Sequence, residues 1–395
     1  MKYALILPDG AADEPVDMLG GRTPLEMANI PNIDWVSTNG RQGRVRTVPR
    51  SFSPGSDVCT MSLMGYDPAK DYTGRAPLEA AAQNITVAGD DLVFRCNLVT
   101  ILQDVMEDFT AGHISSSEAA TLIAELDQRV AGVGAKFHSG VSYRHLVVLK
   151  DAGDVDCTCT PPHDIIGKKV QPYLPKGAGV NRVRELMDRA AFVLAEHEVN
   201  HVRRDLGENP ATNIWLWGQG KSRLLESFQQ RYGVRGAVIA AVDLVRGLAK
   251  LIGMDVIHVE GATGYLDTDY RAKGQAAVEA LDTYDLVVVH IEAPDEAGHN
   301  GDAKAKIQAI ERVDKHIVGP VLEKLRGFDA WKILVAPDHP TPVNKRTHTD
   351  EPPPFCLAGT GVHAVLERPF SESHAAASDL QIDAGHTLME YFLKP

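Results

Sequence analysis

The sequence predicts an α/β protein, with a mostly parallel sheet flanked by helices and an α+β domain inserted into it. The first observation is a set of short, wholly apolar runs bounded by turn residues, as is typical of strands buried on both faces: 3–7, 238–242, 256–259, 286–291 and 333–336. The second is helical periodicity between or after these runs, clearest over 302–325, with Asp302 as the N-cap and Gly327 as the stop. Alternating strands and helices indicate the α/β class.

The middle of the chain has a different pattern, which predicts the insertion. A strand at 92–102 precedes a helix at 118–130, and a strand at 141–150 precedes a helix at 182–198. Residues 151–175 are rich in Pro, Asp and Gly and predict a long loop. We therefore expect a discontinuous core of residues 1–88 and 229–395, interrupted by a domain of residues 89–228.

Composition excludes several classes of protein. With 395 residues, 44% of them hydrophobic and 24% charged, the chain is expected to fold as one large domain with an insertion or as two domains. The formal net charge of −13 argues against bulk binding to nucleic acid or to an anionic membrane. The N-terminal apolar run is broken at Pro8 and Asp9, and no run approaches the ~20 residues of a membrane span. Five scattered cysteines, without zinc-site spacing, indicate reduced thiols in a cytoplasmic protein.

Three predicted core strands are followed directly by potential metal ligands. Asp9 follows the first strand, Asp295 and His299 follow strand 286–291, and Asp338 with His339 follows strand 333–336. Sites in open α/β sheets form outside the carboxyl ends of the strands, so these side chains are expected to meet. Carboxylate oxygen with imidazole nitrogen suits Mn²⁺ or Zn²⁺ and tolerates Mg²⁺ or Co²⁺.

His348 and Ser56 extend this candidate site. His348 closely follows the Asp338-His339 loop, and Ser56 begins a short predicted helix, whose N-terminus would favour a phosphate group. Each residue has a simpler interpretation alone: Ser56 as a helix cap, the Asp-Gly and Asp-His pairs as turns, and the Asp295–His299 pair as a surface helix start. A dinuclear metal site beside a nucleophilic serine explains them all together.

With these residues identified, the sequence resembles the archaeal-type, cofactor-independent phosphoglycerate mutases of the alkaline phosphatase superfamily. The resemblance runs nearly end to end, and its motifs are specific as a set. The segments are LPDG at 7–10, PGSDV at 54–58, LMGYDP at 63–68, YTGRAPLE at 72–79, FRCNL at 94–98, APDEAGH at 293–299 and APDHPTP at 336–342.

The resemblance implies an alkaline-phosphatase-like core that binds two divalent metal ions, with Mn²⁺ expected. It implies one metal held by Asp295, His299 and His348, and a second held by Asp9, Ser56, Asp338 and His339. Ser56 would be the phosphorylated nucleophile in the interconversion of 3-phosphoglycerate and 2-phosphoglycerate, without 2,3-bisphosphoglycerate. Ser56 would take the phosphoryl group from one hydroxyl, and the reoriented glycerate would take it back on the other.

The inserted domain then becomes the expected lid and substrate-binding cap. Arg95 and Arg144, within strand patterns, are candidates to hold a carboxylate, although a solvated strand face is the simpler interpretation. His163 and Asp164 follow two prolines in the long loop, where a proton-handling role competes with an ordinary turn. Lys221 completes the set of candidate substrate contacts.

Three alternatives to the mutase remain. Two are enzymes that transfer the phosphoryl group between other partners, and the third has no catalytic activity. A homoserine-kinase-like phosphotransferase would use ATP, and a metal-dependent phosphomonoesterase would use water. A non-catalytic binding descendant should have lost some of the seven candidate ligands, yet all are present. The mutase remains the preferred interpretation, with a small phosphorylated substrate as the expected partner.

Overall fold

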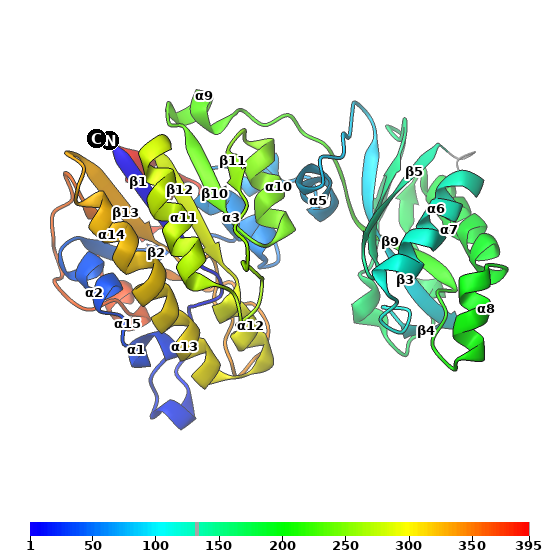
Figure 1. Ribbon diagram of the computed structural model, residues 1–395, viewed down its shortest axis with the longest axis horizontal. Coiled ribbons are helices and arrows are strands. Elements are labelled where there is room, and N and C mark those ends of the chain that lie inside the picture. Colours follow the sequence, from blue (N-terminus) through cyan, green and yellow to red (C-terminus); the bar gives the residue numbers. More distant parts are fainter. Residues whose placement is uncertain (131–133, 395) are drawn as a thin grey trace. The chain divides into compact units, whose positions relative to one another are not determined.

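The computed structural model describes residues 1–130 and 134–394, which fall into two compact units. The core unit joins Met1–Tyr72 to the C-terminal segment from Leu224, and the inserted unit is Thr73–Arg223 (Figure 1). The expected boundaries after residues 88 and 228 differ from these. Residues 73–88 belong to the inserted unit because helix α5 (Arg75–Ala82) packs Ala76 and Ala80 on that unit's sheet. Residues 224–228 belong to the core, where Phe228 is buried.

The core unit is built on a sheet that has eight strands within the described residues. Their order is β11-β10-β12-β1-β13-β14-β2-β15, and the first five are parallel to one another. The predicted parallel α/β architecture is therefore confirmed. The bounds are β1 (Lys2–Pro8), β2 (Arg41–Val45), β10 (Gly236–Ile239), β11 (Asp255–Ile257), β12 (Leu286–Ile291), β13 (Trp331–Val335), β14 (Pro354–Gly359) and β15 (Gln381–Ile382).

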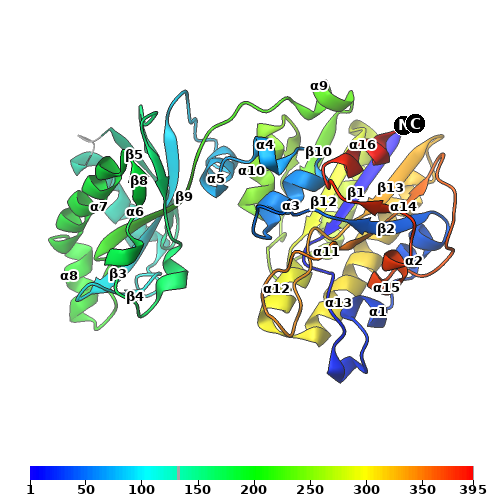
Figure 2. The same cartoon turned by 180° about the vertical axis from the view of Figure 1, so that it is seen from behind.

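Helices cover both faces of the core sheet. One face carries α2 (Pro31–Thr38), α11 (Tyr270–Thr283), α13 (Ala303–Val313) and α14 (Gly319–Leu325), and the other carries α3 (Ser56–Leu63), α10 (Asp243–Leu251) and α16 (Thr387–Leu393) (Figures 1 and 2). Shorter helices lie at the periphery: α1 (Pro24–Met27), α4 (Pro68–Asp71), α9 (Phe228–Tyr232) and α15 (Glu372–Ala376).

The long helix predicted over 302–325 is present, but it is interrupted. Asp302 caps it by accepting a hydrogen bond from the N–H of Ala305, as expected. A π-helical turn at Asp314–Val318 separates α13 from α14. Pro320 explains the interruption, because it has no N–H to donate and its ring would clash with the carbonyl four residues earlier.

The inserted unit is an α+β layer structure. Its described sheet has the order β4-β3-β6-β5, with β9 on the other side of β3. Helices α6 (Ser116–Arg129) and α7 (Val180–Ala195) bury one face of this sheet, and α5 covers part of the other. The strands are β3 (Leu92–Leu102), β4 (Val105–Asp108), β5 (Ala135–Val141), β6 (Arg144–Leu149) and β9 (Asn213–Lys221), and α8 (Glu198–Asp205) follows α7.

Two local predictions in the inserted unit need correction. The segment 141–150, predicted as one strand, contains the end of β5, a turn at Ser142 and then β6. The φ of +54° at Ser142 is incompatible with a continuous strand. The loop predicted over 151–175 contains β7 (Asp156–Thr158), which pairs with β8 (Lys176–Ala178). The Pro- and Asp-rich composition of this loop concealed the short strand.

The composition predicted reduced cysteines and no membrane-spanning segment. All five cysteines are free thiols, with the Cys157 and Cys159 sulfurs 3.9 Å apart. In residues 1–130 and 134–394, we find no helix with the length and apolar character needed to cross a bilayer.

Candidate active site

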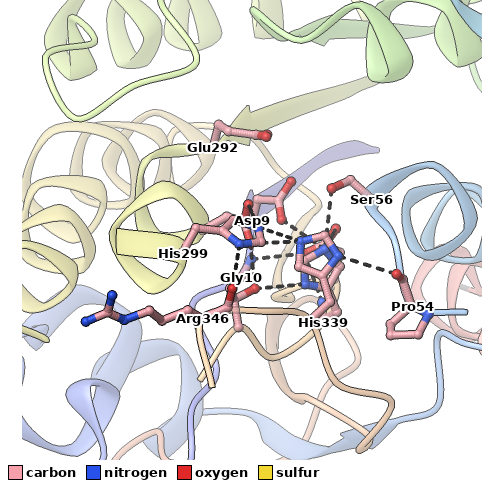
Figure 3. Close-up of polar contacts among 12 residues, drawn as sticks. Asp9, Gly10, Pro54, Ser56, Glu292, His299, His339 and Arg346 are labelled. Carbon is pink, nitrogen blue, oxygen red and sulfur yellow. Dashed lines mark hydrogen bonds and ion pairs between the residues drawn. The ribbon is translucent and has the colours of Figure 1, made fainter. Parts of the chain in front are cut away.

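The parallel order of the sheet determines where the candidate ligands lie. Strand β1 lies between β12 and β13 in parallel register, with Pro8 opposite Ile291 and Ile6 opposite Val335. The carboxyl ends of these three strands therefore meet at one edge of the core sheet. Asp9 follows β1, and helix α12 (Ala293–Asn300) follows β12. The close-up in Figure 3 shows the side chains converging at this edge.

The first ligand cluster consists of Asp295, His299 and His348. His299 Nε2 lies 3.2 Å from Asp295 Oδ2 and 2.9 Å from His348 Nε2. His348 Nε2 in turn lies 3.4 Å from Asp295 Oδ1. The Nδ1 atoms of the two histidines face backbone carbonyl oxygens instead. Nδ1 of His299 lies 3.1 Å from the oxygen of Arg346, and Nδ1 of His348 lies 3.4 Å from the oxygen of Pro54. A carbonyl only accepts, so Nδ1 of each ring carries a proton, and Nε2 is the atom that each ring directs toward Asp295 and would offer to a cation in exchange for its own proton.

The electrostatics of the first cluster follow from its geometry. The hydrogen bond with Asp295 raises the pKa of His299 to about 9. Burial raises the pKa of the Asp295 carboxyl, but the adjacent imidazoles of His299 and His348 outweigh burial and lower it below its usual range. Asp295 is therefore ionised at neutral pH and available as a ligand.

The second cluster consists of Asp9, Asp338 and His339, all fully buried. His339 Nε2 lies 3.4 Å from Asp9 Oδ1 and 3.4 Å from Asp338 Oδ2. Asp338 Oδ1 accepts hydrogen bonds from the backbone N–H groups of Gly10 and His339, which fixes the carboxylate. Asp9 Oδ1 and Asp338 Oδ2 are buried and have no hydrogen-bond partner among the described residues. Such atoms are costly to bury, and a divalent cation would satisfy both.

Without a cation, the second cluster resists ionisation. Burial, followed by the charges of Asp338 and Glu292, raises the pKa of Asp9 well above its usual range. Burial also lowers the pKa of His339. A bound cation would reverse the penalty on the carboxylates, since it supplies the missing positive charge.

Ser56 lies beside the second cluster. Its Oγ atom is 3.4 Å from His339 Nε2, and Figure 3 shows it pointing toward that imidazole. The N-cap of α3 is Gly55, so Ser56 occupies the first helical position and its hydroxyl is not used as a cap. The simpler interpretation of Ser56 as a helix cap is therefore wrong, and the hydroxyl is available for chemistry.

Close packing between the loops depends on a glycine and a threonine. Gly10 has φ of +61°, and a Cβ there would lie 2.6 Å from Asp295 Oδ1, so only glycine lets the loop after β1 approach α12. Thr341 Oγ1 donates to Asp295 Oδ1 at 2.5 Å and lies 3.2 Å from His339 Nδ1. Thr341, which the sequence analysis missed, therefore joins the two clusters.

Sequence reasoning also missed His290 and Glu292. His290 Nε2 lies 2.8 Å from Asp9 Oδ2 and 3.6 Å from Glu292 Oε2. Burial lowers the pKa of His290 to about 4, and it raises the pKa of Glu292 to about 7. The available signal was a histidine in an otherwise apolar strand, followed two residues later by an acid on the same face.

In the inserted unit, Arg95 and His163 both lie close to Trp217. The Arg95 guanidinium stacks 4.1 Å from the Trp217 ring and donates to Glu79 at 3.0 Å. The His163 ring centroid is 5.3 Å from that of Trp217. Burial lowers the pKa of His163, and the charges of Arg95 and Arg75 lower it further. The structure thus places Arg95 and His163, two of the five predicted substrate contacts, beside the same tryptophan.

The other three predicted contacts have different environments. Arg144 is exposed at the start of β6, 5.6 Å from the Tyr143 ring. Asp164 is exposed, 3.8 Å from His163 Nε2. Lys221 pairs with Leu92 at the end of β9, whereas Trp217 pairs with Arg95, so Lys221 lies four residues along the strand from this group.

A buried ion pair supports the loops of the site. Lys306 Nζ on α13 donates to Asp13 Oδ2 at 2.7 Å and to the carbonyl oxygens of Ala12 and Thr341 at 3.0 and 2.9 Å. Both charged side chains are fully buried. Lys306 therefore joins the loop after Asp9 to the loop after His339.

We expect Lys306→Met to lower the free energy of unfolding of the core by about 3–5 kcal/mol, because Asp13 would remain buried without a counter-charge. The urea midpoint of the core transition measures this loss. Lys304→Met, at an exposed position on the same helix, is the matched control and should change it little. A loss no larger than that of the control would contradict the assigned role.

The chain is similar to known proteins over its whole length. A family model described as 2,3-bisphosphoglycerate-independent phosphoglycerate mutase matches residues 37–200. A relative of that name from Methanothrix thermoacetophila is 48% identical over 394 residues, covering 100% of both chains. A probable 2,3-bisphosphoglycerate-independent phosphoglycerate mutase from Geobacter sulfurreducens is 46% identical over 399 residues, again covering 100% of both.

Two solved structures share the fold over almost the whole chain. A protein from Pyrococcus horikoshii matches with a TM-score of 0.84 and 30% identity, covering 99% of this chain and 96% of its own. The cofactor-independent phosphoglycerate mutase from Thermoplasma acidophilum matches with a TM-score of 0.70 and 26% identity, covering 100% and 99%. The chain belongs to the family of 2,3-bisphosphoglycerate-independent phosphoglycerate mutases.

Proposed function

We propose that this chain interconverts 3-phosphoglycerate and 2-phosphoglycerate through a phosphorylated Ser56, without 2,3-bisphosphoglycerate. The observation that supports this best is the Ser56 hydroxyl, which is not used as a helix cap and lies 3.4 Å from His339, beside two clusters of metal-ligand type. The substrate is a small, soluble phosphorylated acid, and the cytoplasm is the proposed compartment.

We assign the metal ligands in two sets. Asp295, His299 and His348 would hold one divalent ion, and Asp9, Ser56, Asp338 and His339 the other. The second assignment is supported by the carboxylate oxygens of Asp9 and Asp338, which have no hydrogen-bond partner among the described residues. The first is supported by the Nε2 atoms of His299 and His348, which converge on Asp295 while each Nδ1 faces a backbone carbonyl oxygen. Mn²⁺ is the proposed ion, with Mg²⁺, Co²⁺ and Zn²⁺ as the competitors to test. Bound divalent ions supply positive charge that offsets the negative charge of the phosphoryl group.

The chain's own residues account for the transfer. Ser56 Oγ gives up its proton and attacks phosphorus, the Oγ–P bond forms, and the P–O bond to the substrate oxygen breaks. The released substrate oxygen takes up a proton, for which His163 is the proposed carrier. The amino end of α3 favours the negative charge that collects at Ser56. The other glycerate hydroxyl then attacks the phosphoserine, and Ser56 leaves. Because the phosphoryl group is held on the chain between the two steps, no bisphosphorylated cofactor is needed.

The inserted unit is proposed to bind the glycerate part of the substrate. Arg95 and Arg144 would bind the carboxylate, and His163 with Asp164 would handle a proton; Lys221 is a further candidate. The stacking of Arg95 on Trp217 and the depressed pKa of His163 support a prearranged group of this kind.

Arg144→Met is expected to raise KM for 3-phosphoglycerate about 10-fold and to leave the fold unchanged, because the side chain is exposed. The comparison is steady-state kinetics of the variant against Arg189→Met, another exposed arginine of the inserted unit. Equal KM values for the two variants would remove Arg144 from the substrate contacts.

One assay separates the mutase from its alternatives. The purified chain is mixed with 3-phosphoglycerate and Mn²⁺, without 2,3-bisphosphoglycerate, and 2-phosphoglycerate is detected by coupling to enolase. Parallel reactions contain ATP with homoserine, and 3-phosphoglycerate with detection of free phosphate. We expect 2-phosphoglycerate to dominate. Product only with homoserine would favour the kinase-like alternative, and free phosphate alone would favour the phosphomonoesterase.

A further inference from the structure

We propose that Cys157 and Cys159 form a redox modification site, which closes to an internal disulfide by exchange with a small-molecule disulfide and thereby displaces the loop that carries His163. The Sγ atoms of the two cysteines lie 3.9 Å apart, in contact but not bonded. The site lies within the inserted unit. This inference goes beyond the proposed function and rests on it only for the role given to His163.

The pair differs from the other three cysteines of the chain in its access to solvent. Cys159 is partly exposed, whereas Cys59, Cys96 and Cys356 are fully buried. Attack on an external disulfide requires contact between the thiol and that molecule, so a buried thiol does not react. Oxidation by a small disulfide should therefore be confined to Cys159 and its neighbour Cys157.

The contact between the two thiols also favours the reactive form of one of them. When the Cys159 S–H donates a hydrogen bond to the Cys157 sulfur, it stabilises the Cys157 thiolate and lowers the pKa of that thiol from its usual value. The thiolate is the species that attacks a disulfide. The geometry that brings the sulfurs together therefore also supplies a nucleophile for the exchange.

The exchange takes place in two balanced steps. The thiolate of one cysteine attacks the small disulfide, a mixed disulfide forms, and the first small thiol leaves. The other cysteine gives up its proton and attacks the mixed disulfide, so the Sγ–Sγ bond forms and the second small thiol leaves. Two electrons pass from the protein to the small disulfide, and the protons of the two protein thiols end on the two small thiols.

Closing the bridge must shorten the chain between the two cysteines. Cys157 lies in β7 and pairs with Gly177 of β8, and Cys159 follows β7 directly. Two residues of extended chain span about 6.4–6.8 Å, whereas the Cα atoms of a disulfide usually lie about 5.5–6 Å apart. The sulfurs must also approach from 3.9 Å to about 2.05 Å. The residues after Cys159 are therefore pulled toward β7.

The segment that is pulled leads directly to His163. Thr160, the residue after Cys159, is held in place because its carbonyl oxygen accepts a hydrogen bond from Trp215 Nε1 of β9 at 2.8 Å. The two residues that separate Thr160 from His163 are prolines, whose fixed φ makes the connection stiff. Oxidation should therefore strain the hydrogen bond to Trp215 and move His163, the residue proposed above to handle a proton.

The first measurement detects the bridge. The full-length chain is reduced, freed of reductant, incubated with glutathione disulfide, quenched in acid, alkylated and digested with trypsin. The tryptic peptide of residues 151–168 contains both cysteines and no other. In the wild-type chain this peptide should lack two hydrogen atoms and resist alkylation until it is reduced, and in Cys159→Ser it should form no internal bridge. Thr158→Ala, at the exposed position between the two cysteines, is the matched control and should form the bridge.

The second measurement detects the displaced loop, through backbone amide hydrogen exchange over residues 160–168. Exchange should become faster on oxidation in the wild-type chain and in Thr158→Ala, and should not change in Cys159→Ser. A wild-type chain that forms no bridge would overturn the modification site, and unchanged exchange in a bridged chain would overturn the displacement of the loop. The proposed function fails separately, through the absence of 2-phosphoglycerate, because neither measurement uses substrate.

Discussion

Ser56→Ala is expected to reduce mutase turnover by at least about 10⁴-fold. Loss of a nucleophile that forms a covalent intermediate removes the route itself, and such losses reach about 10⁶-fold in serine enzymes. In this chain no described hydroxyl other than Ser56 is hydrogen-bonded to His339 Nε2, so a nearby side chain should not replace it. The fold should be unaffected, because Gly55 rather than Ser56 is the N-cap of α3.

The measurement is kcat for the conversion of 3-phosphoglycerate, together with detection of phosphoserine by mass spectrometry after rapid quenching. The control is Ser53→Ala, at an exposed position of the loop that precedes α3. Wild-type and control chains should both give a phosphorylated peptide that contains residue 56, and Ser56→Ala should give none. Turnover in Ser56→Ala close to that of the control would rule out the phosphoserine mechanism.

The residues of the two ligand clusters could be predicted because a strong local pattern coincides with a topological rule. Asp9 directly follows an apolar strand, Asp338 and His339 follow another within four residues, and Asp295 and His299 lie on the helix that begins just after a third. His348 lies farther along, in the segment between β13 and β14. Parallel strands place their carboxyl ends at one edge, so the position in the sequence translates into a position in space. Helix α12 then presents Asp295 and His299 on one face, as their spacing of four predicts.

The residues that were missed act across strands or loops, where the sequence gives no direct information on neighbours. His290 gains its importance only because β12 pairs with β1 in a register that places it beside Asp9. Thr341 becomes important only when the loop after β13 folds back onto α12. Strand β2 was not predicted for a related reason. Its sequence, RQGRV, has no apolar run, and it forms a strand because it pairs with β14.

The inserted unit was predicted less well because its helix α5 is short and rich in alanine. Alanine suits a helix but does not indicate which core the helix will join. The choice is made by packing, since Ala76 and Ala80 contact Val93, Leu146 and Val148 of the inserted sheet. Long-range contacts of this kind also decide that Arg95 stacks on Trp217, residues separated by most of the inserted unit.

Asp338→Asn is expected to lower the affinity for Mn²⁺ by about 10²-fold or more and to remove nearly all mutase activity. Asparagine keeps an oxygen at the Oδ1 position, which accepts hydrogen bonds from the N–H groups of Gly10 and His339. It replaces Oδ2, the buried oxygen with no hydrogen-bond partner among the described residues, by an amide NH₂ group that cannot bind a cation. Changes in residues that only support ligands already cost about 10–100-fold in metal affinity, so loss of a ligand should cost at least as much.

The thermal stability of Asp338→Asn separates a metal-ligand role from a structural one. Without metal, the variant should melt at or above the wild-type temperature, because the like-charge repulsion between Asp338 and Asp9 is removed. Added Mn²⁺ should raise the melting temperature of the wild-type chain, since a ligand that binds only the folded state stabilises it, and should raise that of the variant much less. Asp329→Asn, at an exposed position, should respond to Mn²⁺ as the wild type does. If the metal-free variant melted well below the metal-free wild type, Asp338 would be a structural residue rather than a ligand.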